Sequence, residues 1–191
     1  RKETSAIKPS VTALGGDSQS ILPYLIRARQ ACIYPELVKK AIEKYIKDGL
    51  IDDDPDFLEA INSSSKIDQL VKTIDERKIN GRNKLIFCHF RGEIDILESK
   101  IANLGLAVKT FDGRTSHNQR NEILENACDV LILQIQTGCE GLNLQQFSEV
   151  YFVSPHWNPA VEDQAIARCH RIGQESQVDV FRFTMDNFGS T

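Results

Sequence analysis

The chain has 191 residues, of which 41% are apolar and 26% charged, close to the averages of globular proteins. This composition excludes wholesale disorder, a collagen-like repeat and a coiled coil, and no apolar run approaches the ~20 residues that a membrane helix requires. The formal net charge of −4 argues against coating nucleic acid by bulk attraction, but local basic contacts remain open. The five cysteines are scattered without a Cys-x-x-Cys pair, so we expect neither a disulfide framework nor a zinc site.

Residues 1–62 contain little strand signal and differ in pattern from the rest of the chain. Residues 10–20 are rich in Ser, Thr and Gly, which is typical of a loop or of disorder. Helices are expected over 21–33 and, from the apolar spacing, over 37–46. We therefore expect a helical insertion or linker segment with a disordered start over 1–62.

From residue 63 onward, strand and helix patterns alternate along the chain. Strands are expected over 84–90, 107–111, 130–133, 150–153 and 178–183. Between them lie helical patterns, one closed by Gly105, one opened by a Ser116–Gln119 capping box and one opened by Asn158 and Pro159. Such alternation predicts an α/β fold over 63–191, a mostly parallel sheet with helices on both faces.

Three polar segments follow expected strands, at 88–92, 134–144 and 154–159. In open α/β sheets ligands bind at the carboxyl ends of the strands, so these segments are the candidate binding loops. The helix after the third segment is the most informative. No Lys or Arg occurs between Asn121 and Ala167, and then two arginines follow within four residues.

Gln164, Arg168 and Arg171 are spaced i, i+4 and i+7, which places them on one face if the helix continues through all three. A pair of guanidinium groups is suited to binding phosphate. The alternative is an ordinary solvated basic face, which is the more frequent explanation of two helical arginines.

Other candidates have simple alternatives. Gly138 and Gly141 could let backbone approach a phosphate, although no P-loop ending is present and an ordinary turn is the more frequent explanation of such a pair. Trp157, the one tryptophan, could stack on a base or sugar, or anchor a core. Residues 112–114 indicate a turn first, and His89 is more often a structural histidine than a catalytic one.

Several motifs in the second part of the chain carry a family resemblance. They resemble, in order and spacing, the second RecA-like lobe (helicase C-terminal domain) of Swi/Snf-type ATPases in helicase superfamily two. The motifs are KLIFCHF at 84–90, FDGR at 111–114, GCEGLNL at 138–144, WNPA at 157–160 and QAIARCHRIGQ at 164–174. The segment ARQACIYPEL at 28–37 is similar to a helical insertion of this family, especially in the helicase-like transcription factor subgroup.

The resemblance implies a RecA-like lobe of a DNA-dependent ATPase that translocates on duplex DNA in chromatin or protein–DNA remodelling. In that family Arg168 and Arg171 would be arginine fingers, and Gln164, Gly138 and Gly141 would line the nucleotide cleft. ATP and Mg²⁺ would be held mainly by a first RecA-like lobe that this chain does not contain. We therefore expect the chain to be a fragment that is inactive alone and whose partner is that first lobe.

The resemblance also implies contacts with the DNA backbone and hence no sequence preference. The matching positions are His89, Arg91, Gly113, Arg114, Gln136, Asn143 and Trp157. The chain departs from the family at Gln136, where Lys or Arg is common, and at His156, where Trp or an acid is common. The family implies a nuclear location in a eukaryote and otherwise a cytoplasmic, DNA-associated one, with no membrane partner. Two alternatives remain: a catalytically inactive RecA-like interaction module and an RNA helicase lobe.

Overall fold

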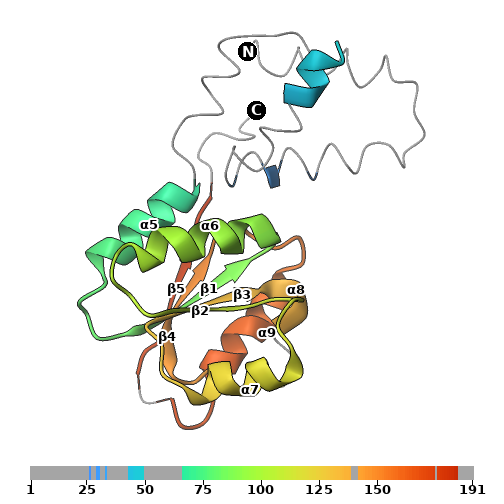
Figure 1. Cartoon of the computed structure of the whole chain (residues 1–191). Coiled ribbons are helices and arrows are strands. Elements are labelled where there is room, and N and C mark those ends of the chain that lie inside the picture. Colours follow the sequence, from blue (N-terminus) through green and yellow to red (C-terminus); the bar gives the residue numbers. More distant parts are fainter. Residues whose placement is uncertain are drawn as a thin grey trace, which may run out of the picture. The chain divides into compact units, whose positions relative to one another are not determined.

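The computed structural model describes residues 66–138, 142–174 and 176–184, and a few positions before residue 50. The chain divides into two compact units, Arg1–Asn62 and Ser63–Thr191. In the first unit residues 26, 29, 30, 33 and 43–47 are helical. The loop expected over 10–20 lies outside the described residues. So do the remaining residues of the helices expected over 21–33 and 37–46. The second unit holds the sheet and the helices that cover it (Figure 1).

The strands of the second unit form one sheet in the order β2-β3-β1-β4-β5, and each of the four pairings is parallel. Their bounds are β1 Asn83–Cys88, β2 Val108–Phe111, β3 Val130–Gln134, β4 Phe147–Phe152 and β5 Asp179–Arg182. All five expected strands are therefore present. β4 begins three residues earlier than expected, because the polar residues Ser148 and Glu149 are buried within it.

Helices cover both faces of this sheet, as the alternating pattern predicts. Their bounds are α5 Lys66–Glu76, α6 Arg91–Ala102, α7 His117–Glu125, α8 Ile135–Gly138 and α9 Pro159–Cys169. Figure 1 shows α5 and α6 on one side of the sheet and α7 and α9 on the other. The α/β prediction is thus confirmed.

Local sequence signals set several helix ends. The Ser116 hydroxyl accepts a hydrogen bond from the Gln119 backbone N–H, and the Gln119 side chain accepts one from Ser116, which completes the predicted capping box. The Asn158 side chain caps α9, with Pro159 at its first helical position. After α6 the chain reverses at Gly105, whose φ of +81° suits glycine.

The core contains apolar side chains from both faces of the central strands. Every residue from Lys84 to Cys88 is buried, as is typical of a central parallel strand. On one face Phe87 stacks on Phe152 with ring centroids 5.1 Å apart, in the same cluster as Ala165 of α9. This packing fixes β1, β4 and α9 against one another and so positions the loops that follow them.

None of the described helices is both long enough and apolar enough to cross a membrane. The described cysteines, Cys88, Cys128 and Cys169, are free and buried. Cys32 and Cys139 lie outside the described residues.

Candidate functional site

Four of the expected DNA-binding positions lie at the same edge of the sheet. Because all pairings are parallel, the strands share a carboxyl edge, and the loops after β1 to β4 begin there. His89 follows β1, Gly113 follows β2, Gln136 follows β3 and Trp157 follows β4. The fold therefore brings to one edge positions that lie as far apart as residues 89 and 157 in the sequence.

Trp157 is a solvent-facing aromatic side chain on a loop that is held in place. It is 66% exposed, which excludes the alternative that it anchors the core. The backbone N–H of the preceding His156 donates to Glu162 Oε1 at 2.7 Å, and Glu162 Oε2 accepts from Arg182 Nε at 2.8 Å. The ion pair to β5 thus fixes the loop that presents the indole.

His89 has a structural role at this edge. Its side chain is buried, Nε2 lies 2.8 Å from the Ser154 carbonyl oxygen, and its ring stacks on His156 at 5.5 Å between centroids. Because a carbonyl only accepts, Nε2 carries the proton. The side chain joins the loops after β1 and β4, so the structure favours the structural alternative over an exposed contact.

The residues after β2 form the predicted turn. Asp112 accepts the Arg114 backbone N–H at 2.7 Å and the Arg114 Nε at 2.8 Å, and Arg114 also donates to Asp95 of α6. Burial would raise the pKa of Asp112, but the hydrogen bonds from Arg114 outweigh burial and lower it. Arg114, expected to bind DNA, therefore has its guanidinium held by two carboxylates of this chain.

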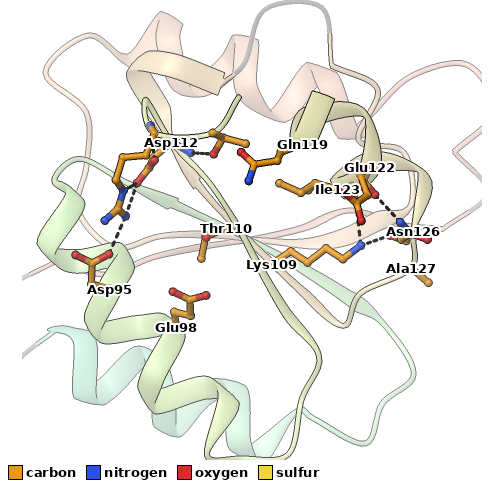
Figure 2. A pocket seen from close by; sticks show the side chains of 12 residues that line it. Asp95, Glu98, Lys109, Thr110, Asp112, Gln119, Glu122, Ile123, Asn126 and Ala127 are labelled. Atoms are coloured by element: carbon orange, nitrogen blue, oxygen red, sulfur yellow. Dashed lines mark hydrogen bonds and ion pairs between the residues drawn. The ribbon is translucent and has the colours of Figure 1, made fainter. Parts of the chain in front are cut away.

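Beside this turn lies a groove of about 690 Å³ (Figure 2). It follows edge strand β2 between α6 and α7, and Glu98, Lys109 and Glu122 are among its charged lining residues. Of the expected site residues it contains only Arg114. The groove is thus separate from the arginine pair.

The expected arginine pair is arranged differently from the prediction. α9 ends at Cys169, and the cap residue His170 leaves the helical region with φ −91° and ψ 73°. Arg171 begins a turn that is closed by a hydrogen bond from the Gln174 N–H to the Arg171 carbonyl at 2.9 Å. The expectation that Gln164, Arg168 and Arg171 share one helical face is therefore wrong for Arg171.

The arginines also lie at the opposite edge of the sheet from the loops just described. The Leu144 N–H donates to the Arg168 carbonyl at 3.3 Å, and the Gln174 side chain reaches the carbonyl of Phe147, the first residue of β4. The end of α9 thus lies beside the amino end of β4. α9 begins at the carboxyl edge, directly after the loop that follows β4, and runs back across the sheet, so the arginines near its end lie away from that edge.

Arg168 and Arg171, the expected arginine pair, are both at least partly accessible to solvent. Arg168 is half-buried and Arg171 exposed. Neither has an ion pair within the part of the chain that the structure describes. In contrast, Arg77, Arg82 and Arg182 are each paired with a carboxylate. Gln164 is exposed on α9, Gly138 ends α8 at the carboxyl edge, and Gly141 lies outside the described residues.

A buried ion cluster that the sequence did not indicate lies on the α5 face. The fully buried Glu149 carboxylate accepts hydrogen bonds from Arg77, from Asn80 at 2.8 Å and from the Tyr151 hydroxyl at 2.8 Å, and it pairs with Lys84 at 3.5 Å. Burial would raise the pKa of Glu149, but these hydrogen bonds lower it below its usual value. Burial also lowers the pKa of Lys84. The cluster joins the end of α5 to β1 and β4.

No group of three or more His, Cys, Asp or Glu that could hold a metal ion occurs in the ranges that the structure describes.

The fold and these positions define a RecA-like α/β lobe. The helicase conserved C-terminal domain family matches residues 65–173, more than half of the chain, so the chain belongs to this family. This finding confirms the resemblance to the C-terminal RecA-like lobe of Swi/Snf-type superfamily-two ATPases that the motifs indicate.

Individual relatives agree with this assignment. The DNA repair protein RAD5 of Candida albicans is 39% identical over 137 residues, which cover 65% of this chain and 13% of that protein. RAD5B of Arabidopsis thaliana, also a DNA repair protein, is 35% identical over 127 residues, 63% of this chain and 10% of that protein. The crystal structure of the C-terminal part of the Fun30 ATPase domain matches with a TM-score of 0.60 and 28% identity, covering 65% of this chain and 42% of that one. The chain thus spans about an eighth or less of the length of these curated relatives.

Proposed function

We propose that the chain is the second motor lobe of a Swi/Snf-type DNA-dependent ATPase that translocates on duplex DNA and so remodels chromatin or other protein–DNA complexes. In this proposal Arg168 and Arg171 act across a cleft on ATP and Mg²⁺ bound by a first RecA-like lobe. The family membership supports the lobe assignment, and the RAD5 relatives, which are DNA repair proteins, support action on DNA in the nucleus.

One observation carries the catalytic part of the proposal. Two arginines without an intramolecular carboxylate, among the residues described, lie at the end of α9, within the segment that matches the family. An arginine that faces the γ-phosphate stabilises the charge that develops there in the transition state, and removing it costs roughly 10³–10⁵-fold in rate. This role needs guanidinium groups that are not already neutralised by carboxylates of their own lobe.

The DNA-binding part of the proposal rests on the carboxyl edge. There the exposed Trp157 and Arg91 lie on loops or helix starts that follow β4 and β1, and Gln136 is exposed after β3. Side chains of this kind can stack on a sugar or base and contact phosphates without reading sequence. Arg114 and His89 contribute by fixing their loops, since Asp112, Asp95 and Ser154 already bind them.

The test uses the full-length protein that contains this lobe. Arg168→Ala and Arg171→Ala should each abolish ATP turnover while ATP binding, measured by equilibrium titration, changes by about threefold or less. Lys78→Ala is the matched control, because Lys78 is an exposed cation whose partner is Asp75 within the same helix end, and it should hydrolyse ATP at the normal rate. A fully active double arginine variant would refute the catalytic assignment.

Two further measurements separate the alternatives. The 191-residue chain alone should neither hydrolyse ATP nor bind it tightly, because the cations it provides lack a phosphate-binding loop beside them. Duplex DNA should stimulate the full-length ATPase more than RNA does. Greater stimulation by RNA would favour an RNA helicase lobe, and no turnover under any condition would favour an interaction module.

A further inference from the structure

Arg171 lies in a turn that has little support of its own. The turn follows the end of α9, and Gly173 within it has a φ of +103°. The neighbouring side chain of Ile172 is fully exposed, so no apolar burial anchors it. An arginine side chain on a turn without a fixed backbone would adopt many orientations. A guanidinium that must contact a phosphate needs a backbone that is held in one position.

The Gln174 side chain ties this turn to two neighbouring segments. Its Nε2 lies 2.7 Å from the Gln145 carbonyl oxygen, 3.3 Å from that of Cys169 and 3.4 Å from that of Phe147. An amide has two N–H donors, so the three acceptors share them, and the Gln145 carbonyl is the nearest. The other amide atom, Oε1, accepts the Ser176 N–H at 3.0 Å. One side chain thus links the turn to the end of α9 and to the start of β4.

A second glutamine makes the reciprocal bond. Gln145 Nε2 donates to the Ile172 carbonyl oxygen at 2.6 Å, so each glutamine binds the backbone of the segment that carries the other. The Leu144 N–H adds a bond to the Arg168 carbonyl at 3.3 Å. The backbone on both sides of Arg171 is therefore held by the segment that precedes β4.

We propose that Gln145 and Gln174 are positioning residues that hold the Arg171 turn in the orientation in which its guanidinium meets the nucleotide. This inference rests on the proposed function. Neither glutamine touches the nucleotide; both act through Arg171. Leu144 is the last residue of the GCEGLNL motif and Gln145 follows it directly, so the same bonds make the placement of Arg171 depend on the placement of the end of that motif.

The experiment compares three variants of the full-length protein: Gln174→Ala, Gln145→Ala and the control Gln146→Ala. Gln146 is the exposed neighbour of Gln145, and its side chain makes no hydrogen bond within the described ranges. We expect Gln174→Ala to lower kcat for ATP by about 10- to 100-fold with KM changed by about twofold or less. Gln145→Ala, which removes a single bond, should lower kcat less, and Gln146→Ala should match the unaltered protein.

A second measurement separates positioning from general stability. Gln174→Ala should weaken binding of ADP with aluminium fluoride, which mimics the transferring phosphate, by at least about tenfold while ADP alone binds normally. A variant that has merely lost stability would lower the thermal midpoint and leave the preference for the analogue over ADP unchanged, and that outcome would overturn the proposal. Because Gln145→Ala keeps every bond of Gln174, it tests the proposal even if Gln174→Ala does not fold.

The failure of this inference can be told apart from the failure of the proposed function. If Arg171→Ala abolishes turnover while both glutamine variants keep the normal kcat, the positioning role is overturned and the arginine role stands. If Arg171→Ala is fully active, both are overturned.

Discussion

Removing the Glu149 carboxylate should destabilise the chain far more than removing a carboxylate at the surface. Its side chain is fully buried and accepts hydrogen bonds from three side chains. Replacing Glu149 by Ala removes the carboxylate partner of the Lys84 ammonium group and of the Tyr151 hydroxyl. Both groups stay in the interior, and Lys84 is only 2% exposed. Breaking a buried ion pair in this way costs about 3–5 kcal/mol, since an uncompensated charge stays buried.

The structure places the expected cost near the lower end of that range. Lys84 Nζ also donates to the Arg82 carbonyl at 2.7 Å and to Asn80 Oδ1 at 3.2 Å, so it keeps two acceptors. Arg77 is about a third exposed and can turn toward water. We therefore expect Glu149→Ala to lower the free energy of unfolding by about 3 kcal/mol. Glu149→Gln, which keeps one carbonyl acceptor, should cost about 1–3 kcal/mol.

The assay is urea unfolding of the chain at pH 7, monitored by far-ultraviolet circular dichroism. The dependence of the unfolding free energy on urea concentration is compared between variants to check that it does not change. The matched control is Asp75→Ala, which removes an exposed partner of Lys78 and should cost at most about 0.5 kcal/mol. If Glu149→Ala unfolds at the same urea concentration as Asp75→Ala, the reasoning about this cluster is wrong.

The folded-state pKa values of Glu149 and Asp179 lie below their ordinary values, so these carboxylates stabilise the fold above about pH 4–5, and this stabilisation is lost as the pH falls through the lowered pKa values. The urea concentration at the unfolding midpoint, measured from pH 7 to pH 2, should therefore decrease in that window. A midpoint that does not change with pH would contradict this. Asn158→Ala removes the hydrogen bond to the Ala160 N–H and should cost about 1 kcal/mol, whereas Asn158→Ser should restore most of it. Trp157→Ala should reduce stimulation of the full-length ATPase by duplex DNA and leave turnover without DNA unchanged; equal loss in both conditions would place Trp157 elsewhere in the mechanism.

The parts of the fold that the sequence predicted are those that local residues determine. Short segments rich in apolar residues predicted all five strands, although only β1, β3 and β4 are buried along most of their length. The capping residues Ser116 and Asn158 predicted the starts of α7 and α9 to the residue. These features depend on residues within a few positions of one another. For Trp157 the sequence left two alternatives, a core anchor and a stacking contact; its exposure excludes the core anchor, and contact with DNA stays a prediction.

What the sequence did not predict depends on contacts between distant segments. The start of β4 includes Glu149, a charged residue that in sequence is typical of a loop. It is buried in the strand because Arg77, 72 positions earlier, pairs with its carboxylate. After Pro159 at the start of α9 no glycine or proline occurs before Gly173, so the local sequence pattern continues past Arg171, yet the helix ends at Cys169. There the bonds from the Leu144 backbone and the Gln174 side chain hold a different conformation. The spacing in the sequence thus predicted Arg171 on the same helical face as Arg168, whereas the structure places Arg171 in the turn after α9.

α9 determines how the two candidate surfaces relate to each other. Its 11 residues span about 16 Å, from the Trp157 loop at the carboxyl edge to the Arg171 turn at the amino end of β4. Both ends are fixed, the first by Glu162 and Asn158 and the second by Gln174. A helix held at both ends transmits displacement as a rigid element, so DNA bound at one end and a nucleotide bound at the other would be coupled by movement of the whole lobe. Two spin labels placed at exposed positions of α9 and α6 should therefore keep the same separation with and without nucleotide in the full-length protein, while a label on each lobe should report a change.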